Sequence, residues 1–308
     1  MSRRQPVFSI IVPTYRRPDA LRACVEALAV LDYPRDDFEV IIVDDGGSEP
    51  LTSVIQPVAG DLRVKVVWQP NAGPAAARNF GAVHATGDML AFTDDDCAPA
   101  SDWLRAFAGA CAASDPTLLG GRTVNALRHN AYAGVSQLII DVVYAHYNRE
   151  PLRARFFASN NMAVPTELFR RVNGFDPDFR TSEDRDLCDR WLSQGYQLRY
   201  VPEAVIYHAH VLTLSSFWKQ HAGYGRGAWL YHTARAERGT GSFQPDWEFY
   251  RSLLRSPLSG ESAGDIVRGY SLLMVAQLAN AAGCFEQATK AYLRRRRSPA
   301  PSGRPEQP

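Results

Sequence analysis

Residues 8 to 45 read FSIIVPTYRRPDALRACVEALAVLDYPRDDFEVIIVDD, and the pattern of these residues indicates the fold class. The two apolar runs, residues 8–12 and 40–43, have the length of buried strands. Between them, apolar residues from Leu21 to Leu31 recur at helical spacing, and Pro18 suits the first turn of a helix. A strand, a helix and a second strand in this order form the βαβ unit from which parallel sheets are built.

The chain beyond this stretch continues the alternation of short apolar runs with helix-like segments. We expect strands at 62–68 and 89–92, and then helices at 165–172 and 182–194, short strands at 198–201 and 204–207, and a helical or lid-like segment at 131–140. Polar residues alternate with apolar ones over 62–68, so that strand should lie near an edge. The sequence therefore predicts an α/β fold, Rossmann-like, with a mostly parallel open sheet flanked by helices.

Composition narrows the class of protein. The chain has 308 residues, 45% hydrophobic and 22% charged, which is typical of a folded globular protein. The formal net charge is +1, so no overall field favours nucleic acid as a partner. The five cysteines are widely spaced with no CxxC pair, and the first apolar run is too short for a signal peptide. We therefore expect reduced cysteines and a cytoplasmic protein.

Several common motifs are missing from the sequence. No GxGxxG follows the first strand, no GxxxxGK[ST] occurs anywhere, and no GxSxG provides a serine nucleophile. Dinucleotide cofactors, P-loop ATP chemistry and serine hydrolysis therefore lack their usual signatures. If phosphates bind, we expect a metal ion to hold them.

Polar residues follow three of the expected strands, at the sheet edge where ligands of open α/β folds bind. Thr14, Tyr15 and Arg16 follow the first strand, and Asp94, Asp95 and Asp96 follow the fourth. Three adjacent carboxylates repel one another unless a cation lies between them. Asp94 and Asp96 could face one Mg²⁺ or Mn²⁺ ion, or the three could form a solvated acidic turn before the next helix.

The polar residues after the second and third expected strands also have purely structural interpretations. Asp44 and Asp45 could accept hydrogen bonds from a ribose or a base, but Asp-Asp-Gly-Gly also suits an Asx turn. The loop from Asn71 through Gly73 to Arg78 could meet an anion or a base edge, or could simply begin a helix.

A second acidic cluster begins at Glu183 and Asp184, and a YHAH segment follows at 207–210. One carboxylate of this cluster could act as a general base, whereas acidic residues in a first helical turn capped by Ser182 would also stabilise the helix. His208 could bind a metal ion, although a single histidine is more often a packed residue.

Taken in order, these segments resemble the family 2 glycosyltransferases, inverting enzymes of the GT-A fold that use nucleotide-diphosphate sugars. The resemblance runs over about residues 6–235 and is specific as an ordered set. It rests on SIIVPTYRRPDALRACVEAL (9–28), EVIIVDDGGS (39–48), NAGPAAARNFGAVHATGDMLAFTDDDC (71–97), GFDPDF (174–179), SEDRDLCDRWLSQGY (182–196) and YHAH (207–210).

The resemblance implies a role for each matched residue. Asp184, with Glu183, would provide the catalytic base, and Asn160 and Asn161 would lie on the acceptor side. The implied metal ligands are Asp94, Asp96 and His208. The implied nucleotide-sugar site comprises Pro13, Thr14, Tyr15, Arg16, Asp44, Asp45, Asn71, Gly73, Arg78, Asp94 and Asp95. Trp103 and Trp191 would pack in the core.

The resemblance also implies the reaction. A Mn²⁺- or Mg²⁺-dependent enzyme would move a sugar from a UDP, dTDP or GDP sugar to a hydroxyl of a glycan, glycolipid or lipid-linked acceptor, with inversion. Such a reaction would serve the synthesis of the cell envelope or an exopolysaccharide. One alternative is a catalytically inactive nucleotide- or glycan-binding subunit. Another is a sugar nucleotidyltransferase, a class that requires a glycine-rich phosphate-binding motif early in the chain.

We expect a catalytic domain over residues 1–235, with a nucleotide-binding half at 6–122 and an acceptor half at 123–235. A helical extension at 236–293 and a basic, proline-rich, disordered tail at 294–308 would follow. Gly223, Gly225 and Gly227 would loosen the helix before the extension, and could place Arg226 near phosphate. The uncharged run from 269 to 285 is short for a membrane span. We therefore expect this run to form either a packed helix or a peripheral contact with the inner face of the plasma membrane.

Overall fold

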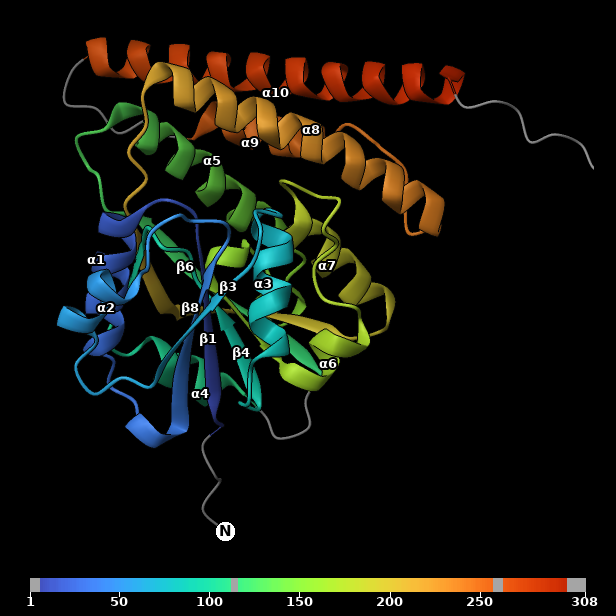
Figure 1. Cartoon of the computed structure of the whole chain (residues 1–308). Coiled ribbons are helices and arrows are strands. Elements are labelled where there is room, and N and C mark those ends of the chain that lie inside the picture. Colours follow the sequence, from blue (N-terminus) through green and yellow to red (C-terminus); the bar gives the residue numbers. More distant parts are fainter. Residues whose placement is uncertain (1–5, 112–115, 257–262, 298–308) are drawn as a thin grey trace, which may run out of the picture.

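The computed structural model describes residues 6–111, 116–256 and 263–297. An open sheet of eight described strands lies below a layer of C-terminal helices (Figure 1). The strands are β1 (Phe8–Thr14), β2 (Phe38–Asp44), β3 (Val64–Trp68), β4 (Met89–Phe92), β5 (Cys97–Pro99), β6 (Thr117–Asn125), β7 (Met162–Pro165) and β8 (Gln197–His208), in the order β3-β2-β1-β4-β7-β6-β8-β5.

Helices cover both faces of the sheet and its upper edge (Figure 1). They are α1 (Pro18–Ala29), α2 (Thr52–Ala59), α3 (Pro74–Val83), α4 (Trp103–Ala110), α5 (Ala131–Tyr147), α6 (Thr166–Arg171), α7 (Glu183–Ser193), α8 (Leu214–Arg238), α9 (Trp247–Arg255) and α10 (Ala263–Arg297). The helices expected near 165–172 and 182–194 are confirmed as α6 and α7. The segment expected to be helical at 131–140 is the first part of α5.

The N-terminal half of the sheet is parallel, as the sequence predicts. β1 lies between β2 and β4 and is parallel to both, and β3 is the edge strand beside β2. Alternate residues of β1 enter two different cores: Ile10 packs with α1, α2 and α4, and Ile11 packs with α3 and α6. Trp103 is fully buried in the first core and Trp191 in the second, which confirms that both are packing residues.

The C-terminal half of the sheet is mixed. β7 is antiparallel to both β4 and β6, and β5 is antiparallel to β8. The two short strands expected at 198–201 and 204–207 form one strand, β8, which runs parallel to β6. Its register shifts between Gly121 and Arg122, opposite the segment that holds Pro202. Proline cannot donate to the ladder, so an irregular stretch accommodates it without ending the strand.

The glycines of α8 serve close packing, so the expectation that they loosen the helix is wrong. α8 is continuous through Gly223, Gly225 and Gly227. It lies side by side with α10 (Figure 1). A Cβ added to Gly225 would lie 1.9 Å from the carbonyl oxygen of Asn280, so only glycine allows this approach.

Other expectations for the C-terminal region also need correction. Residue 235, the expected end of the catalytic domain, lies inside α8. The four arginines at 294–297 end α10 and do not belong to a disordered tail, and residues 298–308 lie outside the described part. Among the described residues, no helix has both the length and the hydrophobicity that a membrane crossing requires. Peripheral membrane contact through this region stays a prediction.

Candidate active site

The end of β1 and the turn after β4 are joined by a buried hydrogen bond. Thr14 donates its hydroxyl to Asp95 at 2.7 Å, and both residues are buried. Asp95 therefore points away from the site and ties the acidic turn to the sheet. Tyr15 is 43% exposed at this edge, and the guanidinium of Arg16 lies 5.0 Å from the centre of its ring.

Arg17 neutralises the acidic turn, and sequence reasoning missed it. Its guanidinium forms ion pairs with Asp95 and with Asp96, the latter at 2.8 Å. The position of Arg17 could have indicated this role, because Arg17 lies in the loop after β1, immediately before α1. The neighbouring Arg16, expected at the nucleotide site, contacts Tyr15.

Arg78 joins the acidic turn to the second acidic cluster. It donates to Asp94 at 2.6 Å and to Glu183 at 2.9 Å, and its side chain is only 4% exposed. Burial alone would lower the pKa of Arg78, but the two carboxylates outweigh it and raise that pKa further. The guanidinium thus bridges two carboxylates, and its expected contact with a nucleotide base stays a prediction.

Asp44 and Asp45 organise turns. Asp44 accepts a hydrogen bond from the backbone N–H of Gly47 at 2.7 Å, which is the Asx turn considered above. Asp45 accepts hydrogen bonds from the backbone N–H groups of Ala72 and Gly73, both at 2.8 Å, and from the side chain of Asn71. These two carboxylates and Asn71 shape the loop before α3; both oxygens of Asp45 are occupied, whereas Asp44 accepts a single hydrogen bond.

The acidic residues of α7 have different partners. Glu183 is tied to Arg78, Asp186 pairs with Arg190 and Arg238, and Asp189 pairs with Arg235 and Arg238. Asp184 has no ion-pair partner in the described part of the chain. It accepts hydrogen bonds from its neighbour's N–H at 2.8 Å and from that of Ser159 at 3.4 Å. Although Ser182 precedes the helix, its side chain accepts no capping hydrogen bond from the first turn.

Burial and the negative charge of Glu183 raise the pKa of Asp184 to about 7. A carboxyl group with this pKa exchanges its proton near neutral pH, which is the property required of a general base.

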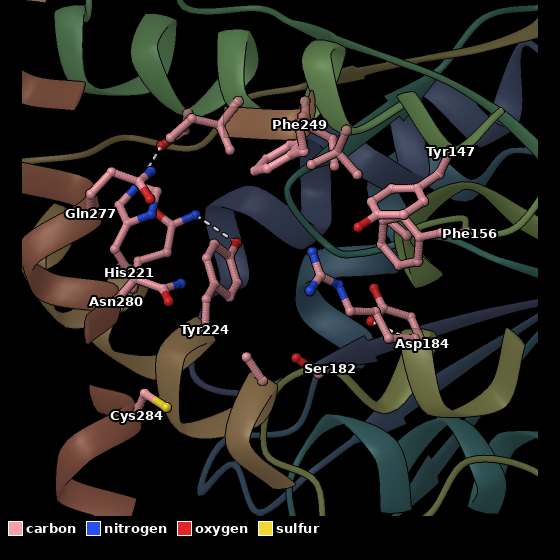
Figure 2. Close-up of a pocket in the computed structure, with 18 of the residues that line it drawn as sticks. Tyr147, Phe156, Ser182, Asp184, His221, Tyr224, Phe249, Gln277, Asn280 and Cys284 are labelled. Atoms are coloured by element: carbon pink, nitrogen blue, oxygen red, sulfur yellow. Dashed lines mark hydrogen bonds between the residues drawn. The ribbon is translucent and has the colours of Figure 1, made fainter. Parts of the chain in front are cut away.

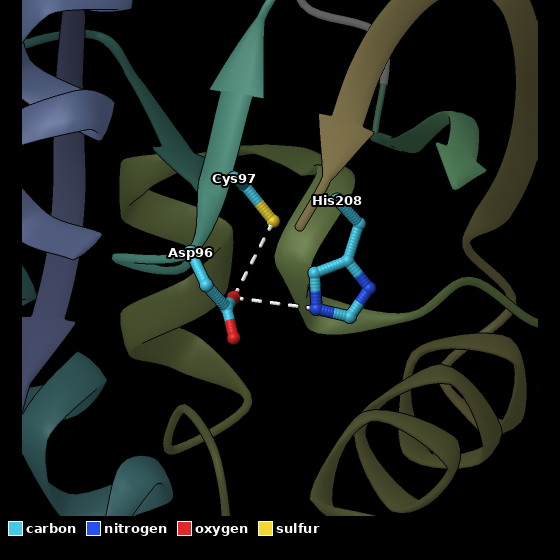
Figure 3. Close-up of side chains that lie close together, drawn as sticks. All are labelled: Asp96, Cys97 and His208. Carbon is cyan, nitrogen blue, oxygen red and sulfur yellow. Dashed lines mark hydrogen bonds and ion pairs between the residues drawn. The ribbon is translucent and has the colours of Figure 1, made fainter. Parts of the chain in front are cut away.

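Asp96 and His208 form a pair that could hold a metal ion (Figure 3). They come together because β5 and β8 pair with Cys97 opposite His208, and the imidazole Nε2 lies 3.3 Å from the Asp96 carboxylate. Burial alone would raise the pKa of Asp96, but His208 and Arg17 outweigh it and hold that pKa well below its usual range.

Two neighbours of this pair fit a metal site less well. Cys97 lies within reach, but burial raises the pKa of its thiol, so the sulfur stays protonated. Asp94 is held by Arg78 and lies outside the group that the structure brings together. Asp96 and His208 offer oxygen and nitrogen donors suited to Mn²⁺ or Mg²⁺, so these two residues fit the expected ion.

The two asparagines expected on the acceptor side face in different directions. Asn161 is fully buried, accepts a hydrogen bond from Trp103 at 2.8 Å and donates to Ala204 at 2.9 Å. Its expected contact with an acceptor therefore needs correction, because all of its polar atoms serve the core. Asn160 lines the cavity described next.

A cavity of about 970 Å³ opens beside Asp184 (Figure 2). Its walls come from α5, α8, α9 and α10, and His208 and Asn160 lie at its sheet side. Tyr147, Phe156 and Phe249 form an aromatic wall near Asp184. A small molecule entering this cavity would reach the carboxylate of Asp184.

Comparison with known proteins identifies the family. The model of glycosyl transferase family 2 matches residues 9–172, and that of glycosyl transferase family group 2 matches residues 91–284. The chain belongs to glycosyl transferase family 2. The matched regions contain the acidic turn, Asp184 and most of the helices that wall the cavity.

Two curated glycosyltransferases match this chain over more than two thirds of its length. The chain is 30% identical over 225 residues to the pre-mycofactocin glycosyltransferase of Mycobacterium tuberculosis, covering 71% of this chain and 46% of the relative. It is 29% identical over 212 residues to glycosyltransferase AglE of Haloferax volcanii, covering 68% of each. The chain thus spans about half the length of the Mycobacterium relative.

Solved structures of glycosyltransferases show the same GT-A fold. A mannosyltransferase from Pyrobaculum calidifontis in complex with GDP-Man and Mn²⁺ matches with a TM-score of 0.60 at 22% identity, covering 94% of this chain and 81% of that one. TarS from S. aureus, residues 1–349 with UDP-GlcNAc, matches with a TM-score of 0.53 at 15% identity, covering 94% and 92%.

Proposed function

We propose that the protein is a metal-dependent, inverting glycosyltransferase, which moves a sugar from a nucleotide-diphosphate sugar to a hydroxyl of an acceptor in the cavity. The observation that carries this proposal is the position of Asp184. It has no ion-pair partner among the described residues, its pKa is raised to about 7, and it lies between the acidic turn and the cavity. Family membership and the GT-A fold support the same reaction.

The reaction balances as one displacement. Asp184 takes the proton from the acceptor hydroxyl as that oxygen bonds to the anomeric carbon. The bond from this carbon to the diphosphate oxygen breaks, and its electron pair leaves with the nucleoside diphosphate. Attack from the face opposite the leaving group inverts the anomeric configuration, and no covalent sugar intermediate is required.

Asp96 and His208 are the residues proposed to hold the divalent ion, with Arg17 beside them. When bound, the ion supplies a Lewis acid that offsets the charge developing on the diphosphate. Mn²⁺ or Mg²⁺ suits this donor set, and structural neighbours hold Mn²⁺ together with GDP-Man or UDP.

The remaining loop residues are proposed to frame the donor site. Tyr15 and Arg16, both on the exposed edge after β1, are available to a nucleotide. The loops around the donor site are shaped by Pro13, Thr14, Asp44, Asp45, Asn71 and Gly73. The charge on the protein side of the donor site is set by the ion-paired group of Arg78, Asp94, Asp95 and Glu183. The donor is proposed to be a UDP, dTDP or GDP sugar.

A thermal-shift screen tests this proposal. The purified chain is heated with UDP, GDP, dTDP, CDP or ADP, each with Mn²⁺ and with chelator. We expect one diphosphate to raise the Tm only with Mn²⁺, because ligands stabilise the folded state that binds them. Asp96→Ala should lose this shift in Mn²⁺ and match the unmodified chain in chelator. An unchanged shift in Asp96→Ala would remove Asp96 from the metal site.

A further inference from the structure

The cavity beside Asp184 has a second wall that the reaction does not require. Gln277 and Asn280 on α10 lie on the side of the cavity away from Asp184 (Figure 2), and Gln220 on α8, which is hydrogen-bonded to Tyr224, lines the cavity with them; these three residues form an amide wall. The aromatic wall defined above lies on the Asp184 side, across the cavity from Gln277 and Asn280 (Figure 2). Sugars match such a pair of walls, because their rings have apolar C–H faces and hydroxyl groups at their edges.

The amide wall has unused hydrogen-bonding capacity. The side-chain amide of Gln220 donates to the hydroxyl of Tyr224 at 2.8 Å, but its buried oxygen has no partner. Within the described part of the chain, the side-chain amides of Gln277 and Asn280 have no hydrogen-bond partner. Leaving a buried acceptor such as the Gln220 oxygen without a partner costs free energy, so a ligand hydroxyl that donates to it is favoured, and the half-buried amides of Gln277 and Asn280 offer further donors and acceptors beside it.

The charge of the cavity is low on the side of the amide wall. Among the described lining residues, Arg185 is the only lysine or arginine, and its guanidinium lies 5.3 Å from the centre of the Phe156 ring, beside Asp184. Asp246 also lines the cavity, but it pairs with His146 at 2.7 Å.

The histidines of this region do not add charge. His221 lies beside Gln277 (Figure 2) and His232 lines the cavity nearer Arg185, and burial lowers the pKa of each to about 4. Both are therefore neutral at pH 7. A phosphate placed at the amide wall would lose its hydration without gaining a cationic partner, which is costly.

We propose that the acceptor is an uncharged carbohydrate, with one ring against the aromatic wall near Asp184 and its further hydroxyls paired with Gln220, Gln277 and Asn280. This inference rests on the proposed glycosyltransferase function and names the class of its acceptor. The volume of about 970 Å³ accommodates a molecule of this kind, since pockets for small ligands span roughly 300–1,000 Å³. A phosphate group at the amide wall is not expected, because the one described arginine of the lining lies beside Asp184.

Ligand-observed NMR on the full chain tests this proposal. The probes are methyl glycosides of glucose, mannose, galactose and N-acetylglucosamine, each compared with the matching sugar 6-phosphate. Mg²⁺, which unlike Mn²⁺ is diamagnetic and does not broaden the ligand signals, is present together with the nucleoside diphosphate that gives the thermal shift. We expect at least one neutral glycoside to bind more tightly than its phosphate partner, a comparison that needs no variant.

A double variant then locates the binding. Gln277→Leu with Asn280→Leu should raise the Kd of the bound glycoside about tenfold, because two hydrogen bonds are lost. Leu278→Gln, on the same helix at a side chain that is 58% exposed, should leave the Kd unchanged. The nucleotide-dependent thermal shift is measured on each variant to establish that it is folded.

The outcomes separate this inference from the proposed function. Tighter binding of the phosphates, binding of no neutral glycoside, or a Kd unaffected by the double variant would overturn the neutral acceptor, even where nucleotide binding is intact. Failure of every nucleoside diphosphate to bind would contradict the donor site itself, on which the inference rests.

Discussion

Adjacent carboxylates on α7 have opposite environments. Glu183 is held by the buried guanidinium of Arg78, whereas Asp184 faces the cavity with backbone N–H groups as its partners. One residue links the helix to the acidic turn after β4, and the other is left to exchange a proton. Two carboxylates at the same helix end thereby take different roles.

The pH dependence of transfer follows from the pKa of Asp184. A general base acts in its deprotonated form, and the pKa of Asp184 is raised to about 7 by burial and by Glu183. We therefore expect kcat/KM to fall about tenfold per pH unit below pH 7 and to level off above it. Initial rates at saturating Mn²⁺ between pH 5 and pH 9 check this. A profile that is flat from pH 5 to pH 7 would show that another group accepts the proton.

Arg78 is expected to be the most costly arginine of the site to replace. Arg78→Met leaves the carboxylates of Asp94 and Glu183 without their cation, so the free energy of unfolding should fall by about 3–5 kcal/mol. Urea denaturation measures the change. The matched control is Arg22→Met, which removes an exposed pair with Glu26 and should cost less than about 1 kcal/mol. Equal losses in both variants would refute the structural role of Arg78.

The sequence predicts that the acidic residues share one site, but it does not predict which arginines form ion pairs with them. Asp96, His208 and Asp184 lie near one another because the ordered motifs fix the fold. The partners of Asp95 and Glu183, which are Arg17 and Arg78, depend on side-chain directions in turns, which no periodicity encodes. Asn161 shows the same limit, since nothing in the sequence separates it from Asn160.

At the scale of elements, the crossing of α8 and α10 depends on small residues. A Cβ at Gly225 would lie 1.9 Å from the carbonyl oxygen of Asn280, and one at Gly283 would lie 1.9 Å from that of Ala222. The two helices therefore touch through their backbones. This contact positions Gln277 and Asn280 at the cavity.

Alanine substitutions distinguish a packing glycine from a tolerant one. Gly225→Ala should force α8 and α10 apart and lower the free energy of unfolding by about 1–3 kcal/mol. Gly134→Ala, in α5, has nothing within 4 Å of the added Cβ and should raise stability by about 0.5–1 kcal/mol. Urea denaturation of both variants gives the two signs. Stabilisation of the protein by Gly225→Ala would contradict the close crossing.

The elements that sequence reasoning recovered are those with clear periodicity. β1, β2, β4 and α1 follow from apolar runs and helical spacing, and the polar alternation placed β3 at the edge. The sequence predicts two short strands where the structure has the single strand β8, because the register shift that carries Pro202 depends on pairing with β6. The antiparallel direction of β7 is set by tertiary pairing, which the local pattern does not contain.

At the scale of the whole molecule, the site joins the sheet edge to the C-terminal helices. Val135 of α5, Phe217 of α8, Leu253 of α9 and Leu273 of α10 share one buried core. The cavity beside Asp184 is walled by these same helices. The sequence predicted a helical extension, but its place over the acceptor side comes from this shared core, which pairs residues far apart in the chain.

The central claim is that Asp184 is the general base of sugar transfer, and one variant tests it most directly. Asp184→Asn keeps the shape of the side chain and cannot accept the proton. We expect transfer from the nucleotide sugar to fall by about 10²–10⁴-fold, while the Mn²⁺-dependent thermal shift by the nucleoside diphosphate is retained. Transfer within a few-fold of the unmodified chain would contradict the account.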